Sequence, residues 1–236
     1  MRQVVAPARV GLLVGCLLLA ACGTAAPPQG QPAAALVPVL ANLASAKLPV
    51  YLPSRLPSPP AGSNGYAIDA RATAGSYDVS IHWYAKPVSI NAPVAVARDA
   101  FIAEIWGGAA GSLPPMPAAT FTGQGESVAI VPGIVGTFYP GHGLGWTEGG
   151  WSYAIMSGFA TTPASLLPPA RRIQVSLPAA GNPIGPGTHG QLVMPIGAEA
   201  PDTWVRWTQG RFTYEIDGLI MPGDEVARAL VRVTLP

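Results

Sequence analysis

The chain has 236 residues, with 13 basic and 12 acidic side chains, and only 11% of its residues are charged. Soluble proteins usually carry about 25% charged residues, so small uncharged side chains must cover much of this surface. The near balance of charge, without any basic cluster, argues against nucleic-acid binding. Glycine and proline number 28 and 27, but the aromatic residues favour a packed core over a disordered chain.

An apolar run covers residues 10–21 and follows a stretch that carries Arg2 and Arg9 but no acidic residue. This order is typical of a secretory signal peptide. A transmembrane helix needs about 20 apolar residues, and this run is shorter. We therefore expect residues 1–21 to be a signal peptide that is removed from the mature chain.

The end of this segment resembles the lipobox of bacterial lipoproteins, because Leu19, Ala20, Ala21 and Cys22 match its four positions. The resemblance implies diacylglyceryl transfer to the Cys22 sulfur, cleavage before Cys22 and acylation of the new amino group by a fatty acid such as palmitate. Two or more acyl chains hold a protein on a membrane, whereas one binds only marginally. In two-membrane bacteria an aspartate after the cysteine favours the inner membrane, so Gly23 leaves the outer membrane open. We expect an extracytoplasmic protein on the cell membrane.

The cysteine count limits the chemistry of the mature chain. Cys16 leaves with the signal peptide and Cys22 takes the lipid, and the sequence has no other cysteine. The mature protein then has no thiol for a disulfide, a catalytic nucleophile or a soft metal ligand. We predict no cofactor and no metal.

Residues 22–47 are rich in alanine and proline and carry no charge before Lys47. This composition predicts a tether, with a weak helix over 33–46 that Pro38 interrupts. The remaining residues, 48–236, then form a single domain. We expect its class to be α+β, with antiparallel hairpins backed by short helices.

Two alternating segments, 66–72 and 77–84, are separated by a short turn sequence and predict a β-hairpin. Downstream, Asn91 is a suitable N-cap for a helix over 92–106, because Val94, Ala97, Phe101 and Ile105 recur at helical spacing.

The chain also contains an internal similarity. Residues 146–153 (WTEGGWSY) match residues 207–214 (WTQGRFTY) at a spacing of 61 residues. Both copies continue through Ile155 or Ile216 toward a Val-x-Leu-Pro sequence. This pattern predicts a two-fold repeat, with halves over about 120–178 and 190–236.

The repeat predicts two hairpins of the same register. A two-residue turn at Gln209 and Gly210 pairs Trp207 with Phe212, with their aromatic side chains on one face, and the same register pairs Trp146 with Trp151.

A helix is expected after each hairpin. Asp224 is a suitable N-cap for the last helix, in which Val226, Ala229, Leu230 and Val233 share one face. The helix of the first copy contains Pro168 and Pro169 and is expected to be shortened.

A Trp-bearing strand, a Gly-containing turn, a Tyr-x-Ile sequence and a helix recur in both copies. Over residues 140–236 this order resembles a bacterial domain of unknown function that is found in envelope lipoproteins and near anti-sigma factors. That family has no established catalytic residues to transfer to this chain.

The candidate sites are few. His82, His142 and His189 are not at metal-ligand spacing, and Ser112, Ser157 and Ser165 lack a nucleophile motif, so surface or core-edge roles are favoured. Glu215 and Asp217 share a strand face, for which solvent exposure is the simpler explanation.

The residues with the clearest potential for binding lie in the two copies of the repeat. His142 lies between Gly141 and Gly143, and Gly145 follows two residues later. In a strand these three glycines would line one face without side chains, so that either a ligand or another element of the protein can approach closely. Trp204 lies opposite the face of Trp207 and is a candidate for exposed contact with a partner or sugar.

These observations favour a non-catalytic lipoprotein that binds an envelope protein, a lipid or a glycan polymer. The alternative is an envelope-acting hydrolase that uses His142 and nearby carboxylates. A histidine hydrogen-bonded to a carboxylate in a deep cleft would favour the enzyme, and an open aromatic groove would favour the binding module.

Overall fold

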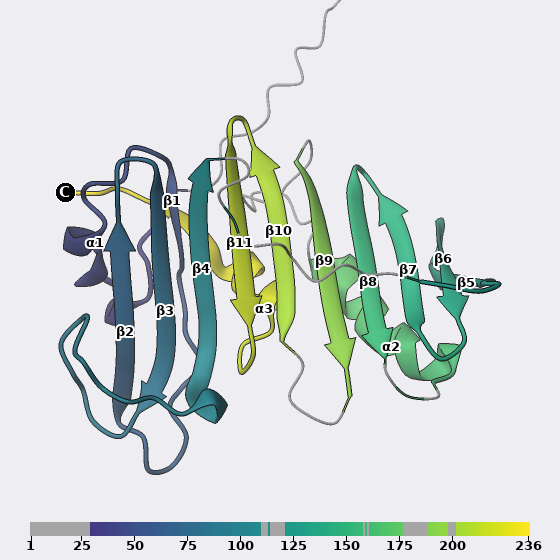
Figure 1. Ribbon diagram of the computed structural model, residues 1–236, viewed down its shortest axis with the longest axis horizontal. Coiled ribbons are helices and arrows are strands. Elements are labelled where there is room, and N and C mark those ends of the chain that lie inside the picture. Colours follow the sequence, from purple (N-terminus) through teal and green to yellow (C-terminus); the bar gives the residue numbers. More distant parts are fainter. Residues whose placement is uncertain are drawn as a thin grey trace, which may run out of the picture.

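The computed structural model describes residues 29–109, 113, 121–157, 159, 161–176, 188–197 and 202–236, so the expected signal peptide over residues 1–21 and Cys22 lie outside the described residues. Ten strands form one sheet in the order β2-β3-β4-β11-β10-β9-β8-β7-β6-β5 (Figure 1). The strands are β2 (Gly65–Ala72), β3 (Ser76–Tyr84), β4 (Phe101–Ala109), β5 (Glu126–Val131), β6 (Ile134–Tyr139), β7 (Gly143–Glu148), β8 (Trp151–Ser157), β9 (His189–Ile196), β10 (Thr203–Gln209) and β11 (Phe212–Gly218).

Neighbouring strands of this sheet are antiparallel, except that β8 and β9 are parallel. A parallel pair needs a crossover connection, and helix α2 (Pro163–Ser176) lies in that connection. The expected α+β class, with a largely antiparallel sheet backed by short helices, is confirmed.

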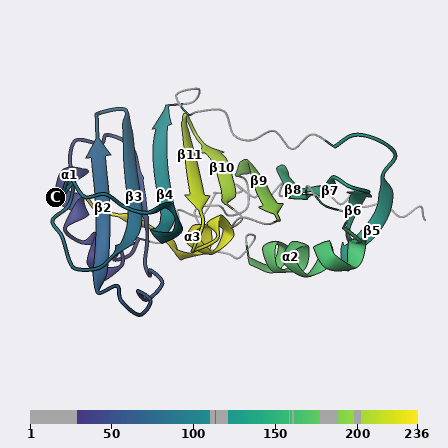
Figure 2. The same cartoon turned by 60° about the horizontal axis from the view of Figure 1, so that its bottom comes forward.

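One face of the sheet is covered. Its cover consists of α1 (Val39–Asn42), α2, α3 (Gly223–Ala229) and a two-stranded sheet of β1 (Val50–Pro53) and β12 (Leu230–Val233). Figure 2 shows α2 and α3 on the same side of the strands. We call the opposite side the open face, because none of these elements covers it. No helix among the described residues is long and apolar enough to cross a membrane.

The first hairpin is confirmed as β2 and β3. Tyr77, Val79 and Ile81 are buried on the covered face, whereas alternate residues of β3 are only half-buried. The alternation of apolar and polar residues determines this arrangement, because successive side chains of a strand point to opposite faces.

The expected helix over 92–106 is wrong. A short 3-10 helix, η2 (Arg98–Ala100), leads into β4, and Asn91 adopts a φ of 60°. The Asn91 side chain accepts a hydrogen bond from the Ala70 amide (2.7 Å) and donates one to the Ala70 carbonyl (3.0 Å). The residue therefore covers the backbone of edge strand β2 instead of capping a helix, and pairing of β4 with β3 and β11 overrides the helical spacing.

The expected tether over 22–47 is not free of structure in its described part. Leu36, at the end of a 3-10 helix η1 (Ala34–Leu36), is fully buried, as are Val39 and Leu43. Burial of such a side chain contributes about 1.5–3 kcal/mol, so these residues pack on the domain although the surrounding composition suggests a linker.

The two C-terminal hairpins are present, and their predicted faces are correct but their predicted pairs are not. Trp146 pairs with Tyr153, and Trp207 pairs with Tyr214, so each turn lies one residue later than expected. In the first hairpin the turn is Gly149–Gly150, both with positive φ, which only glycine adopts readily.

The helices after these hairpins also differ from the prediction. α2 is the longer one, and it includes both Pro168 and Pro169. Leu166, Ala170 and Ile173 are fully buried on one side of it, so packing outweighs the helix-breaking tendency of proline.

α3 begins after Pro222 and ends at Ala229, where the chain becomes extended and pairs with β1. Asp224 lies in its first turn, fully buried and paired with Arg172 (3.2 Å), and no side-chain hydrogen bond caps the helix.

Candidate functional site

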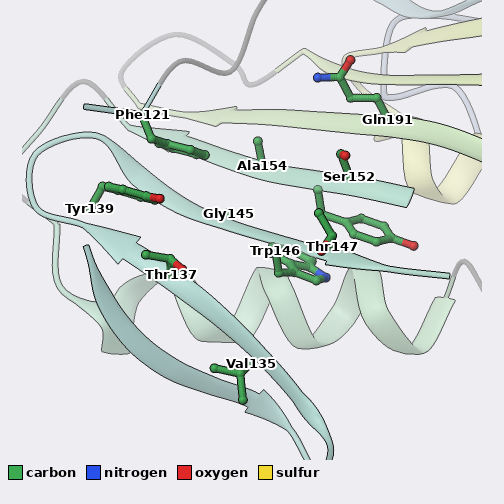
Figure 3. A pocket seen from close by; sticks show the side chains of 11 residues that line it. Phe121, Val135, Thr137, Tyr139, Gly145, Trp146, Thr147, Ser152, Ala154 and Gln191 are labelled. Carbon is green, nitrogen blue, oxygen red and sulfur yellow. The ribbon is translucent and has the colours of Figure 1, made fainter. Parts of the chain in front are cut away.

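The open face of the sheet carries a hollow over strands β6 to β9, with a volume of about 450 Å³. Figure 3 shows it from close by. We call it the trough. None of the residues that line it has a charged side chain; they are Phe121, Val135, Thr137, Tyr139, Gly145, Trp146, Thr147, Ser152, Tyr153, Ala154 and Gln191.

The trough exists because two neighbouring positions on the open face lack large side chains. Gly145 of β7 pairs with Ala154 of β8, so the two strands themselves place no large side chain at the centre of the first hairpin. In the second hairpin the corresponding pair is Arg206 and Glu215, whose side chains form an ion pair. The same backbone register therefore produces a hollow in one hairpin and a filled surface in the other.

An aromatic pair forms one end of the trough. The rings of Phe121 and Tyr139 are stacked, with centroids 4.8 Å apart and planes within 1° of parallel. Phe121 approaches Gly145 so closely that a β-carbon there would lie 2.7 Å from its Cε2 atom. The glycine therefore provides the space that the aromatic pair occupies.

The opposite end of the trough is polar. Thr147 and Ser152 are exposed, and Gln191 is half-buried, as the register of β7, β8 and β9 places them in one row. In Figure 3 Ser152 and Gln191 lie away from the aromatic pair. The arrangement offers hydroxyl and amide groups beside an apolar wall.

Beneath the trough, a hydrogen bond and a ring stack hold Trp146 in place. Trp146 extends to the covered side, where its indole donates a hydrogen bond to Gln174 Oε1 of α2 (2.9 Å). It stacks on Tyr153, with ring centroids 4.9 Å apart. Burial is the main reason that the pKa of the Tyr153 hydroxyl is raised to about 12, so this group stays protonated.

The glycine-rich segment of the sequence divides between a turn and the trough. Gly141 and His142 lie in the turn between β6 and β7 rather than in a strand. Gly143 begins β7 at a φ of 140°, and a β-carbon there would collide with the Ile155 carbonyl oxygen. Of the three glycines, only Gly145 lines the trough.

The side chain of His142 is exposed, and the group beside its imidazole is a hydroxyl. Its Nε2 atom lies within hydrogen-bond distance of Thr122 Oγ1, at 3.2 Å. His82 lies 3.0 Å from Ser80 Oγ, and burial lowers its pKa. Among the described residues, no group of three or more histidine, cysteine or acidic side chains is arranged to hold a metal ion.

The serines with potential for catalysis have local roles. Ser157 Oγ contacts the backbone of Phe159, and Ser165 Oγ donates a hydrogen bond to the Thr162 carbonyl at the start of α2. Ser112 lies outside the described residues.

A row of carboxyl groups crosses the other half of the open face. Glu104 of β4 pairs in register with Asp217 of β11, and Asp78 of β3 is hydrogen-bonded to Glu104. Burial, the bond to Asp78 and the charges of Asp217 and Glu215 raise the pKa of Glu104 to about 7. The carboxyl groups therefore share protons instead of all being ionised.

Trp204 belongs to this carboxyl row. It lies on the open face, as the sequence suggests, but it is half-buried and its side chain is hydrogen-bonded to Asp217. Burial, Asp202 and Glu215 raise the pKa of Asp217 to about 7 despite that bond. The indole is therefore a partner of a carboxyl group and does not stand free for a ligand.

Sequence reasoning missed the aromatic wall. Phe121 follows a proline-rich stretch and lies between β4 and β5, and nothing local indicates that it crosses to β6. For the polar trough residues Thr147 and Ser152, the sequence indicates only that they alternate with the core-facing residues of the hairpin. Comparison with models of known families, with curated proteins and with solved structures finds no match to this chain.

Proposed function

We propose that this protein is a non-catalytic binding module of the cell envelope, anchored on the extracytoplasmic side of a membrane through acylated Cys22, and that the trough is its binding site. The observation that carries the proposal is an uncharged hollow of about 450 Å³ on the open sheet face. Ligand sites are concave and combine apolar walls with a few polar groups, as this one does.

The position of the trough also supports binding. All of its lining residues except Phe121 lie on four neighbouring strands, β6 to β9. Strands hold their side chains at fixed spacing, so a ligand meets a preformed surface and little conformational entropy is lost on binding. The hydrolase alternative has no comparable support, because the imidazole of His142 is hydrogen-bonded to the hydroxyl group of Thr122.

We further infer that the two C-terminal hairpins are copies of one unit. Trp146 pairs with Tyr153 as Trp207 pairs with Tyr214, and both ring pairs stack, at 4.9 and 5.2 Å between centroids. A duplicated hairpin whose copies diverged on the open face explains why one half has a trough and the other has an ion pair.

The anchor is tested in cells that make the full chain, by labelling with a radioactive fatty acid. The wild-type chain should be labelled and sediment with membranes. The Cys22→Ala variant should be unlabelled, because the acceptor sulfur is missing. An unlabelled wild-type chain would refute the anchor without bearing on the trough.

The trough is tested by sedimentation of the purified full chain, in detergent, with isolated cell envelopes. Thr147→Trp should fill the hollow and reduce binding at least tenfold. Thr208→Trp is the matched control, since Thr208 is an exposed threonine at the equivalent position of the second hairpin and does not line the trough. Equal binding by both variants would refute the assignment of the site.

A further inference from the structure

We propose that the trough takes an uncharged, hydroxyl-rich chain, namely a segment of a neutral glycan of the envelope. This inference rests on the proposed function and names the chemistry of its ligand. Proteins and lipids, which are the other two ligand classes, become outcomes of the test.

The charge of the open face selects against ionic ligands. None of the side chains that line the trough is charged, so neither an anion nor a cation would find a compensating partner there. On the same face, β3, β4 and β11 carry four acidic side chains, namely Asp78, Glu104, Glu215 and Asp217. The one charged side chain of the adjoining strand β10 is Arg206. An anionic polymer that left the trough on this side would meet a row of carboxyl groups of which only part is ionised, and the Arg206 guanidinium there is already paired with Glu215.

The mixed lining fits the two kinds of surface on a sugar. A sugar ring presents apolar C–H groups on its faces and hydroxyl groups at its rim. The aromatic pair Phe121 and Tyr139 offers a flat apolar wall with a phenolic hydroxyl, and Thr147, Ser152 and Gln191 offer hydrogen-bonding groups on the other side.

The same lining fits a lipid poorly. An acyl chain is stabilised by removal from water in an enclosed apolar cavity, because hydrophobic stabilisation scales with the apolar area buried. The trough instead lies on the open face, and two of its polar residues, Thr147 and Ser152, are exposed. Hydroxyl groups that face a hydrocarbon chain would lose their hydrogen bonds to water without replacement.

The extent of the trough suits a polymer segment. It crosses four strands, and neighbouring strands lie about 4.8 Å apart, so it is roughly 14 Å long. That length accommodates a short run of sugar units.

The test uses the full chain in detergent and isolated envelopes that have been treated in three ways. Periodate cleaves the vicinal diols of sugars, protease removes proteins and organic solvent removes lipids. We expect periodate to reduce binding at least tenfold, and the other two treatments to leave it unchanged. Binding should also persist between low and high salt, because no charged group is involved.

Two variants show that the trough makes these contacts. Gln191→Leu keeps the side-chain volume but removes the amide, and Tyr139→Leu removes one ring of the aromatic wall. Each should weaken binding of untreated envelopes by about tenfold, which corresponds to a loss of about 1.4 kcal/mol of binding free energy. Thr208→Trp serves again as the control, and thermal melting verifies that each variant is folded.

The outcomes separate the two proposals. Binding that survives periodate but is lost after protease or solvent would overturn the glycan inference and leave the binding module standing. Loss of binding at high salt would overturn it as well, since it would reveal an ionic polymer. A wild-type chain that binds no envelope preparation would overturn both proposals.

Discussion

The hairpins β7–β8 and β10–β11 have the same register and the same stacked Trp–Tyr pair, yet they present different open faces. The first has Gly145 opposite Ala154, and the second has Arg206 opposite Glu215. Backbone register is therefore separable from surface chemistry, because the two faces of a strand are set by alternate residues. The two hairpins also differ below the sheet, where the Trp146 indole of the first donates a hydrogen bond to Gln174 of α2.

The hydrogen bond of the Trp146 indole should contribute to stability, and mutation of the two tryptophans can measure this contribution. Trp146→Ala and Trp207→Ala should each destabilise the protein by about 3–5 kcal/mol, because both indoles are buried in the core. Trp146→Phe should cost about 1–3 kcal/mol more than Trp207→Phe, since it removes the partner of Gln174. The Trp207 indole nitrogen has no partner among the described residues. Urea denaturation measures all four; equal costs for the two Trp→Phe variants would contradict the distinction.

The carboxyl row makes the second half of the open face sensitive to pH. The pKa of Glu104 is about 7 in the folded protein, against an ordinary value of 4.5, so the folded state holds this proton more tightly than the unfolded chain does. The free energy of unfolding should therefore fall as the pH rises from about 4.5 through 7. Melting temperatures across that range provide the measurement.

Variants localise this pH effect. Glu104→Gln and Asp217→Asn should each flatten the pH profile and raise the melting temperature at pH 8, because a neutral amide removes like-charge repulsion. Ser152→Asn, in the uncharged trough, should leave the slope unchanged. A melting temperature that rises with pH in the wild type would be incompatible with the raised pKa values.

Smaller effects are expected at the aromatic end of the trough. Gly145→Ala should displace Phe121 and cost about 0.5–1.5 kcal/mol of stability, comparable to the loss of one aromatic pair. Phe121→Ala removes the obstacle, so addition of Gly145→Ala to it should cost nothing further. Denaturation of both single variants and the double variant gives the coupling energy, and simple additivity would show that the ring does not depend on the glycine.

The smallest effects are expected for substitution of the three histidines. These variants test whether the protein binds a ligand or catalyses a reaction. His82→Ala, His142→Ala and His189→Ala should leave envelope binding unchanged, since none of these residues lines the trough. Loss of biological activity in His142→Ala at an unchanged melting temperature would instead favour the hydrolase. A complementation assay with melting controls decides between these outcomes.

Local pattern alone was sufficient for part of the fold. Alternation in 66–84 predicts β2 and β3, and the Trp–Tyr alternation predicts which residues of each later hairpin face the core. The exact pairs of the first hairpin were displaced because positive φ at Gly149 and Gly150 moves its turn by one residue, and in the second hairpin Gly210 is the turn residue with positive φ. Helical spacing in 92–106 was misleading, since Ile105 lies between Val79 and Ile216 in neighbouring strands.

The sequence by itself determined the α+β class and the inward faces of the hairpins, and it also predicts the signal-like segment and carries the lipobox resemblance, because each of these depends on residues that are close in the chain. Only the tertiary structure decided the site. It joined β8 to β9 in parallel, placed Phe121 over Gly145 and brought Asp78, Glu104 and Asp217 into one row. Those contacts link residues far apart in sequence, and their energies depend on burial and on neighbouring strands, which no local pattern contains.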